Sequence, residues 1–517
     1  MPLNLNAMIV VLAIALAVFH FAKPICLRFM AEADFTRRRN TWLVLTLVGF
    51  LSPNFWVFVF ISGPIIVWSA HKDSNVMALY LLLMHIVPPM AIPLPVPGLE
   101  SLFFFAIYRH LAFTITIPAT LRLMTPKDKI AAGRFIWFDL SILAYLGLLL
   151  VLGLPYESIT ATIRRVFLYG IDTWVLYFVV SRICSNRRAL VDTMATYCLT
   201  CAIFAALAMF ETARSWLLYE GIKEQWGRPG INSYMFRGEA LRAQVSAAHS
   251  ISLGLMIAIG FGFWLYLSSH MRAKSSLTIL VGIGLWMGLF AAFARGPLIG
   301  AAVIFFAYLA LAPKASPRFF KALFITALAL GLVVISPIGD RVIDFVPFMG
   351  KSEAEAGSVI YRQQLAAKSW ELIQLNPFFG SPFVLSAMED LRQGEGIVDL
   401  VNTYADVALF SGLVGLCLFL APFIFGIWSA YGLVKKSAGI DPDLSLLGVS
   451  LIACMLGTLL VLATTSFYWG VRQMYWILAG LVAAYTQLSP IKEETHPQKP
   501  LEPQEPGPRS LVKPMRR

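Results

Sequence analysis

Apolar stretches of about 20 residues, the length that a helix needs to cross a bilayer, follow one another along nearly the whole chain. Short polar or basic segments separate them. We therefore expect an all-α membrane protein that crosses the bilayer many times. In the second half of the chain the pattern predicts spans near residues 192–211, 247–268, 277–294, 297–313, 319–338, 402–428, 444–464 and 470–488.

The first half of the chain has a less regular pattern. Residues 41–70 are apolar but are interrupted near Pro53, which predicts two short passes, and the apolar stretch at 100–123 carries Arg109. Adding these segments to those of the second half, we expect about 14 transmembrane helices, within a range of roughly 12 to 15.

Basic clusters between the expected spans predict the topology, because Lys and Arg are enriched on the cytoplasmic side of membrane proteins. Assigning all of these clusters to the cytoplasm agrees with the span count. It places the segments 212–246 and 339–400 outside and the C-terminus inside. The clusters are Arg28 with Arg37, Arg38 and Arg39; Lys127, Lys129 and Arg134; Arg182, Arg187 and Arg188; Arg272 and Lys274; Lys314, Arg318 and Lys321; Lys435 and Lys436; and the tail after Lys492.

Composition agrees with a membrane solvent. Hydrophobic residues make up 58% of the 517 residues and charged residues 14%, and the mean hydropathy is +0.73. A soluble domain is nearer one half apolar and one quarter charged. The net charge of +12 is explained by the cytoplasmic clusters, so it does not indicate a nucleic-acid partner.

The cysteines and the N-terminus add little chemistry. Cys198 and Cys201 form the motif CLTC inside an expected span, where packing explains them better than a metal site. The six cysteines lie in or beside apolar runs, so we expect no disulfide framework. The first apolar segment lacks a basic leader and a cleavage site, and we interpret it as a retained first span.

The segment 339–400 is the one large hydrophilic piece of the chain, and we expect it to form a loop on the outside face of the membrane. It carries five basic and nine acidic residues, a net charge of −4. Within it, residues 358–380 predict a short amphipathic helix that Pro377 ends. The apolar side of this helix contains Tyr361, Leu365 and Leu372, with Trp370 and Ile373 adjoining. Such a helix is expected to lie on the bilayer surface and wall a cavity.

Arg295 interrupts an apolar run from about residue 276 to 313. As one helix this run would be roughly 57 Å long, about two membrane thicknesses, so it must fold back on itself. We expect the turn at Arg295, with Gly296 permitting it and Pro297 opening the next helix. A helix N-terminus with an adjacent arginine suits a phosphate group. The alternative is an interfacial arginine that reaches lipid headgroups.

A second arginine-rich segment, residues 237–249, lies on the same expected side. Arg237 and Arg242 precede an outside-to-inside span, where the positive-inside rule disfavours them. An anionic ligand accounts for both, with headgroup contacts as the alternative. His249 stands near the start of the span, either as a general base or as a residue that caps or packs there.

Four segments resemble the superfamily of O-antigen ligases and Wzy-type polymerases, most closely its exopolysaccharide polymerase branch. The segments share an order, a spacing and an expected side of the membrane, and together they cover about residues 230–430. They are FRGEALRAQVSAAHSISLG at 236–254, FARGPLIG at 293–300, YRQQLAAKSWELIQLNPFFG at 361–380 and VDLVNTYADVALFSGLVGL at 398–416.

The resemblance implies a GT-C-like glycosyltransferase of the bacterial inner membrane. Such an enzyme transfers glycan, with inversion, from an undecaprenyl-diphosphate carrier to a sugar hydroxyl on the periplasmic face, without metal or other cofactor. Its partners are a lipid-linked oligosaccharide and membrane lipids, with a chain-length regulator and a flippase of the pathway. Diphosphate binding then falls to Arg242, Arg295 and Arg237, and glycan contacts to Arg362, Asn402 and Tyr404.

The catalytic base is the point at which the chain departs from the ligases of this family. Those ligases carry a His-Asn pair at the span after the large loop, whereas this sequence has Val401-Asn402. The candidate bases are the loop carboxylates Asp399 and Glu395, with Asp390 and Glu389 beside them, and His249. We favour a loop carboxylate. The alternative for each acid is that it only solvates the loop.

The sequence divides into three expected regions: an N-terminal transmembrane bundle at 1–230, a ligase- or polymerase-like core at 231–488 that includes the loop 339–400, and a disordered cytoplasmic tail at 489–517. Two other functions stay open. One is an O-antigen ligase that transfers glycan to lipid A core. The other is a transporter of lipid-linked glycan, although a transporter would favour repeated halves and helices broken near midplane.

Overall fold

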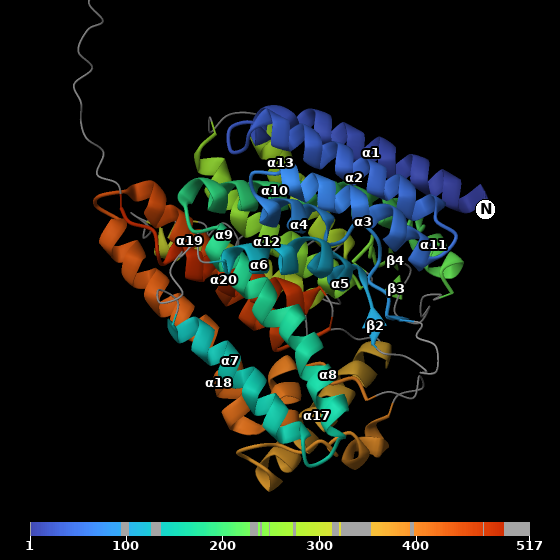
Figure 1. Cartoon of the computed structure of the whole chain (residues 1–517), viewed down its shortest axis with the longest axis vertical. Coiled ribbons are helices and arrows are strands. Elements are labelled where there is room, and N and C mark those ends of the chain that lie inside the picture. Colours follow the sequence, from blue (N-terminus) through green and yellow to red (C-terminus); the bar gives the residue numbers. More distant parts are fainter. Residues whose placement is uncertain are drawn as a thin grey trace, which may run out of the picture.

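A computed structural model describes most of the chain and is built mainly from α-helices (Figure 1). Two short antiparallel ribbons, β1–β2 and β3–β4, are its sheets within the described residues. The described residues are 2–94, 103–125, 136–227, 236–237, 240–247, 249–271, 276–312, 320–321, 353–392, 398–468 and 470–490.

The N-terminal half contains long helices and several short helical segments. Helices α5, η1 and α6 follow one another without a break, as do α8, η3 and α9. The elements are α1 (Pro2–Cys26), α2 (Glu32–Leu51), α3 (Phe55–Lys72), α4 (Val76–Leu83), β1 (Ile92–Pro93), β2 (Phe104–Phe105), α5 (Ile107–Leu111), η1 (Ala112–Thr116), α6 (Ile117–Leu123), α7 (Ile136–Gly153), α8 (Ile159–Gly170), η3 (Ile171–Val175) and α9 (Leu176–Ile183).

The C-terminal half contains the longest helices. Its elements are α10 (Arg187–Arg214), α11 (Glu220–Gln225), β3 (Phe236–Arg237), β4 (Ala240–Leu241), α12 (Ser250–Ser269), α13 (Ser276–Ala291), α14 (Arg295–Leu311), α17 (Glu353–Leu375), η5 (Ser386–Leu391), α18 (Thr403–Ser437), α19 (Pro442–Leu462) and α20 (Val471–Tyr485).

Seven helices in the described part of the chain are long and apolar enough to cross a membrane: α1, α3, the continuous helix Ile159–Ile183, α10, α12, α18 and α19. The shorter helices α7, α13 and α14 are apolar as well. The prediction of a mainly helical fold with several candidate membrane spans is confirmed. The total of about 14 spans stays a prediction, because the expected span at 319–338 lies outside the described residues except for 320–321.

The predicted interruption near Pro53 has a clear structural cause. The expected break near Pro53 separates α2 from α3, and Asn54 caps α3 by accepting a hydrogen bond from Val57 N at 3.0 Å.

Arg38 was expected in a basic cluster between spans, but it lies within α2 and is buried. Its guanidinium pairs with Asp73 at 2.7 Å and Asp192 at 2.6 Å, so it joins α2, α3 and α10.

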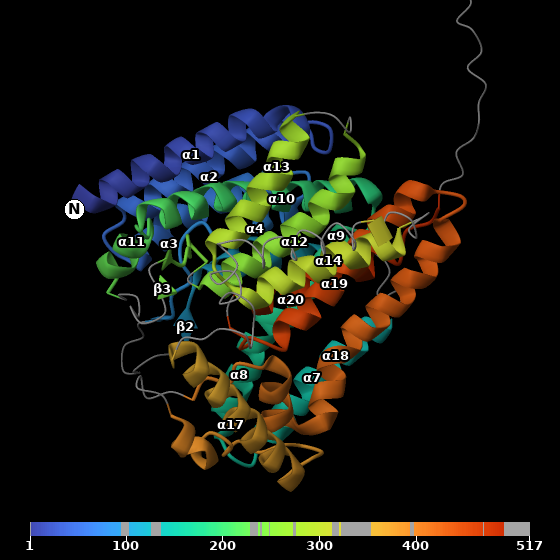
Figure 2. The same cartoon turned by 180° about the vertical axis from the view of Figure 1, so that it is seen from behind.

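The helix bundle has two chemically different ends. At one end, Asn4 donates to Gly221 O, Gln225 donates to Ser52 O, and β2, β3 and α11 gather (Figures 1 and 2). At the other end, Arg28 donates to His270 O. Arg187 pairs with Asp441 there at 3.0 Å, and His270 pairs with Asp443. We call these the α11 end and the His270 end.

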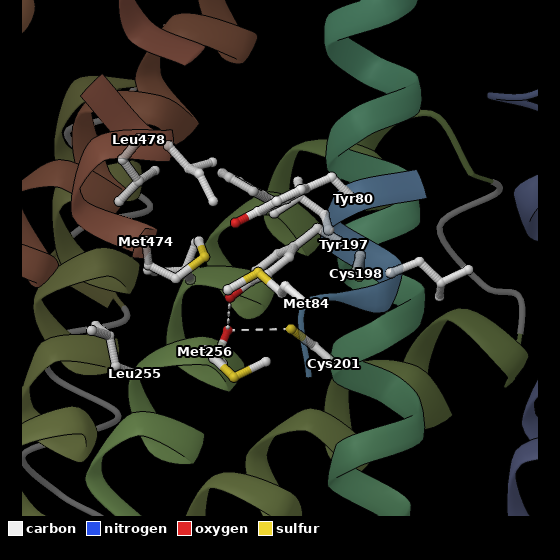
Figure 3. Close-up of a cluster of buried hydrophobic side chains, with 14 of the residues drawn as sticks. Tyr80, Met84, Tyr197, Cys198, Cys201, Leu255, Met256, Met474 and Leu478 are labelled. Carbon is white, nitrogen blue, oxygen red and sulfur yellow. Dashed lines mark hydrogen bonds between the residues drawn. The ribbon is translucent and has the colours of Figure 1, made fainter. Parts of the chain in front are cut away.

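The core lies where α4, α10, α12 and α20 meet, and Figure 3 shows one part of it. Tyr197 OH donates to Met256 O at 3.3 Å, and Cys201 Sγ donates to the same oxygen at 3.2 Å. Cys198 is buried beside them. The interpretation of CLTC as packing is therefore confirmed, because both thiols belong to this core.

Helix α17 stands apart from the bundle, beside α8, α7 and the first half of α18 (Figure 2). The predicted amphipathic helix is confirmed in part. Leu365 is buried against Val384, Met388 and Leu400, whereas Trp370 is exposed. The apolar face of α17 thus packs on its own loop and on Leu409 of α18, and its expected contact with a bilayer stays a prediction. Of the tail at 489–517, only 489–490 are among the described residues.

Candidate functional site

Arg295 is the first residue of α14, at the α11 end of the bundle. The chain turns one step earlier than the sequence indicates, at 292–294, where Phe293 takes the left-handed value φ 44°. The predicted turn at Arg-Gly-Pro is therefore wrong in detail. Gly296 is needed for a different reason: a Cβ there would lie 2.4 Å from Thr464 Oγ1, so it permits close packing against the end of α19.

Arg237 holds this turn in place. Its Nη1 donates to Phe293 O at 3.0 Å from the β3–β4 hairpin. The backbone of Ala243 donates to Ala291 O at 3.0 Å, and Thr212 Oγ1 donates to the same oxygen. The predicted Arg237 is thus attached to the α13–α14 connection.

A buried carboxylate anchors the segment that carries Arg242. Glu211, near the end of α10, is fully buried and accepts backbone N–H bonds from Leu218, Gln244 and Val245, each at 2.9 Å. Hydrogen bonds to a charged acceptor are worth about 1.5–3 kcal/mol each. Since two of the three donors stand two and three residues after Arg242, Glu211 fixes the backbone beside Arg242.

Three arginines from distant parts of the sequence come together around Arg295, which lies within electrostatic range of both Arg242 and Arg362. We call them the arginine cluster. Burial lowers the pKa of Arg242, and the nearby charge of Arg295 acts in the same direction. Burial likewise lowers the pKa of Arg362, where Asp399 opposes the effect and Arg295 adds to it. Arginine stays protonated even so, and three cations held together favour an anionic ligand.

Asp399 is the carboxylate next to this cluster. Its Oδ1 accepts a hydrogen bond from Ser466 Oγ at 2.7 Å, and its backbone N–H and C=O both meet Tyr361 OH at 3.2 Å. The charge of Asp399 acts on Arg362 and His249. The structure therefore holds Asp399 between the loop helix α17 and the α19–α20 connection.

Residues 277–420 match the family model described as O-antigen ligase. We call these residues the O-antigen ligase segment. The resemblance to the superfamily of O-antigen ligases and Wzy-type polymerases is thereby confirmed. A search of curated proteins found no match.

The O-antigen ligase segment includes α13, α14, α17 and the first half of α18, and with them Arg295, Arg362 and Asp399. Arg242 and His249 lie outside it in sequence but join it in space. Members of this family are membrane enzymes of the ligase or polymerase type that act on lipid-linked glycans. The match therefore supports a glycan-handling role in the membrane for this protein.

His249 occupies the N-cap position of α12 and packs on Tyr468 of the α19–α20 connection, with ring centroids 4.8 Å apart. Its imidazole is accessible to solvent, although much of the protein surrounds it. Burial lowers the pKa of His249, Lys223 and Arg242 lower it further, and Asp399 opposes them. The imidazole is therefore neutral at neutral pH. Burial also raises the pKa of Tyr468 to about 12, so the phenol keeps its proton.

Asn402 and Tyr404 have local roles in the O-antigen ligase segment. Asn402 caps α18, and its Oδ1 accepts from Tyr404 N at 2.9 Å and Ala405 N at 3.2 Å. Tyr404 OH donates to Leu459 O of α19. Both residues thus fix the start of α18. Glu395, the other favoured loop acid, lies outside the described residues.

The motif Asn-Pro-Phe-Phe-Gly of this family segment docks into a break in α18. Ser381 N donates to Leu409 O at 2.8 Å, and Leu413 N donates to Pro377 O at 2.8 Å. Within α18, Gly412 has the non-helical value φ 67°. The motif therefore attaches the large loop to the helix that carries Asn402.

Sequence reasoning missed Tyr468, Ser466 and Lys223, which adjoin the site. All three are ordinary polar residues near helix ends. Ser466 lies far along the chain from Asp399, which it contacts, and Tyr468 lies far from its own partner, His249. A weak signal was the polar run Thr464–Tyr468 between two apolar helices. Within the described residues, no group of three His, Cys, Asp or Glu side chains is arranged to hold a metal ion.

Proposed function

We propose that this protein is a polysaccharide polymerase of the bacterial inner membrane, of the exopolysaccharide branch. It transfers glycan from an undecaprenyl-diphosphate carrier to a sugar hydroxyl of a second lipid-linked repeat unit on the periplasmic face. The core that does this is the region 231–488. The observation that carries the proposal is the convergence of Arg242, Arg295 and Arg362 with Asp399 and His249 at one end of a helix bundle.

The arginine cluster is suited to a diphosphate leaving group. When the bond between the anomeric carbon and the diphosphate oxygen breaks, the electron pair stays on that oxygen, and negative charge grows there. Fixed cations that are already in place stabilise such charge without reorganisation. Arg242 and Arg295 contact the diphosphate in this proposal. Arg237 supports them through Phe293, and Arg362 adjoins the donor glycan.

The acceptor hydroxyl attacks the opposite face of the anomeric carbon, which inverts its configuration. The new C–O bond forms as the old one breaks, and the hydroxyl proton passes to a base. We assign that role to Asp399, because it is an accessible carboxylate beside Arg362 and His249. His249, neutral and packed on Tyr468, orients the acceptor. No nucleotide sugar takes part in this reaction.

A second candidate function follows from the description of the matched family. If the acceptor were lipid A core, the same cluster and base would make the protein an O-antigen ligase. The sequence Val401-Asn402, in place of the His-Asn pair that the resemblance implies for ligases, favours the polymerase.

The proposed orientation places the α11 end and α17 in the periplasm and the His270 end and the C-terminus in the cytoplasm. A periplasmic reporter fused after residue 355 is expected to be active, and the same reporter fused after Lys436 is expected to be inactive. The reverse result would invert the orientation and remove the site from the periplasm.

The function is tested by incubating the purified protein with lipid-linked repeat units in the absence of nucleotide sugar. We expect loss of the substrate and growth of longer lipid-linked chains. Addition of lipid A core tests the alternative, since a ligase would transfer glycan to that acceptor only. Substrate that stays intact under both conditions would contradict both enzymatic functions and favour transport. In cells, a chain-length regulator and a flippase are the expected partners.

A further inference from the structure

A groove with a volume of 660 Å³ lies between α2 and α3, far from the arginine cluster. Its position follows from the helix directions: α3 begins at Phe55 near Trp226 of the α11 end and runs to Lys72 at the opposite end. The groove lies toward the His270 end, because both Lys72 and the start of α2 at Glu32 line it. It is therefore a separate feature, on the proposed cytoplasmic side.

The lining of the groove changes from apolar to cationic along its length. Val44, Ile65 and Trp68 form the apolar part, and Val44 and Trp68 are 43% and 56% exposed. The ammonium of Lys72 stands 4.4 Å from the centre of the Trp68 ring at the rim. This order, apolar surface and then a cation beside an interfacial tryptophan, matches the order of an acyl chain and its phosphate.

Neutral polar groups occupy the middle of the groove. Thr36, Asn40, Thr41 and Ser69 line it, and Thr41 and Ser69 hydrogen-bond to each other at 2.7 Å. A lipid-facing surface with such groups is costly unless they meet polar partners. The ester and glycerol oxygens of a phospholipid lie between its chains and its phosphate, so they would meet Asn40 and Thr36.

The charges at the rim favour an anionic headgroup. Glu32, the acid that lines the groove, pairs with Lys23 at 2.7 Å, which offsets its charge. Arg37 also lines the groove and pairs with Asp34 beside it. Its Nε is buried and has no hydrogen-bond partner among the described residues. Lys72 is exposed and is the cation best placed to meet a phosphate.

We propose that the groove between α2 and α3 binds an anionic phospholipid, with its phosphate at Lys72 and one acyl chain along Val44, Ile65 and Trp68. Basic pockets between membrane helices on the cytoplasmic side bind such headgroups in this way. The proposal does not depend on the proposed function, because it uses none of the residues of the arginine cluster. A resident lipid there would join α2 to α3 at the end of the bundle that Arg38 also ties together.

Native mass spectrometry of the full-length protein tests the site, with dioleoyl phosphatidylglycerol and dioleoyl phosphatidylcholine as probes. We expect one tightly retained phosphatidylglycerol in the unmodified protein. Lys72→Gln is expected to weaken its retention about fivefold, the effect of one basic residue, and to leave phosphatidylcholine unchanged. Ala33→Trp, at an exposed residue of the lining, is expected to fill the groove and remove both lipids.

The matched control is Lys435→Gln. Lys435 lies 4.6 Å over Tyr431 in α18, the same cation–aromatic arrangement as Lys72 on Trp68, but it does not line the groove. The Lys435→Gln variant should retain phosphatidylglycerol as the unmodified protein does. Equal retention of the two lipids, or equal losses in Lys72→Gln and Lys435→Gln, would overturn the proposal. Displacement of the lipid by soluble glycerol phosphate would show a free-phosphate site instead. A thermal melt of each variant checks that the fold is intact.

Discussion

The backbone of Gly380 lies directly against the backbone of Gly412, and neither position has room for a side chain. A Cβ on Gly380 would stand 2.8 Å from Gly412 N and 2.4 Å from Leu409 O. A Cβ on Gly412 would stand 2.1 Å from Phe378 O. Both glycines have φ 67°, the left-handed region. This pair joins the large loop to α18, so it sets the position of α17 and Arg362.

Alanine at either glycine is expected to undock the loop. Left-handed backbone alone costs a residue with a side chain roughly 1–3 kcal/mol, and the clash with backbone atoms adds to that. We expect Gly380→Ala and Gly412→Ala to lower the thermal stability in detergent and to speed proteolysis within residues 353–392. The matched control is Gly432→Ala in the same α18, where a Cβ meets no atom of the described residues within 4 Å. It should be neutral or slightly stabilising. Equal behaviour of all three variants would contradict the docking.

The arginine cluster predicts a large and non-additive loss of activity. Removing one preorganised cation from a developing charge costs roughly a hundredfold or more in rate. Arg242→Gln and Arg295→Gln should each reduce consumption of lipid-linked repeat units by about that factor. Because both would contact one diphosphate, the double variant should lose less than the product of the two factors.

Arg392→Gln is the control for this experiment. Arg392 belongs to the large loop that also carries Arg362. Its side chain is 45% exposed and pairs with Glu389, so Arg392→Gln should leave the rate within about twofold of the unmodified protein. Near-normal turnover of Arg242→Gln in well-folded protein would exclude the diphosphate role.

Local patterns predicted the helices, and charges predicted which loops share an end of the bundle. The hairpin expected at 277–294 and 297–313 matches α13 and α14. The arginines expected near one ligand, Arg242 and Arg295, do lie together. Each of these inferences needs only hydrophobic periodicity and the cost of a charge in lipid.

The remaining features depend on contacts between distant segments, which periodicity does not encode. The left-handed turn at Phe293 is held by Arg237, 56 residues earlier in the chain. Glu211 reads as an ordinary acid near a helix end, yet it organises the backbone around Arg242. In the sequence, Gly412 is one small residue within an apolar helix. Only the structure shows that the loop motif docks against its backbone, where the helix is broken.

The contact between His270 and Asp443 predicts how stability depends on pH at the other end of the bundle. His270 Nε2 lies 2.6 Å from Asp443 Oδ1, and this hydrogen bond raises the pKa of His270 above 6.5. A raised pKa in the folded state contributes stability below the unfolded pKa, and the contribution is lost as the pH rises through the folded value. His270→Gln should therefore lower the melting temperature more at about pH 6 than at about pH 9. About a third of each side chain is exposed, so solvent screens the pair. The loss of folding stability in His270→Gln should therefore differ between the two pH values by less than about 1 kcal/mol.

The identity of the base predicts two separable effects at Asp399 and its hydrogen-bond partner. Asp399→Asn should lower kcat by roughly a hundredfold to ten-thousandfold, the usual contribution of a general base, while substrate still binds. Ser466→Ala removes the hydrogen bond to Asp399 Oδ1 without removing the carboxylate. It therefore shows how much of the loss comes from a misplaced side chain, and it should lower kcat about tenfold or less.

His249 gives the discriminating test, because Lys223 is a nearby cation that lowers its pKa. Removing that charge by Lys223→Gln raises the pKa of His249. If His249 were the base, it would have to be neutral, and the fall of kcat/KM at acidic pH would then begin at a higher pH in Lys223→Gln. With Asp399 as the base, proton transfer does not depend on the charge of His249, so we expect the fall of kcat/KM at acidic pH to stay in place in Lys223→Gln. His249→Gln should then retain turnover at a reduced rate, because the acceptor is less well oriented. A shift of this fall to higher pH in Lys223→Gln, together with full loss of turnover in His249→Gln, would transfer the role of base from Asp399 to His249.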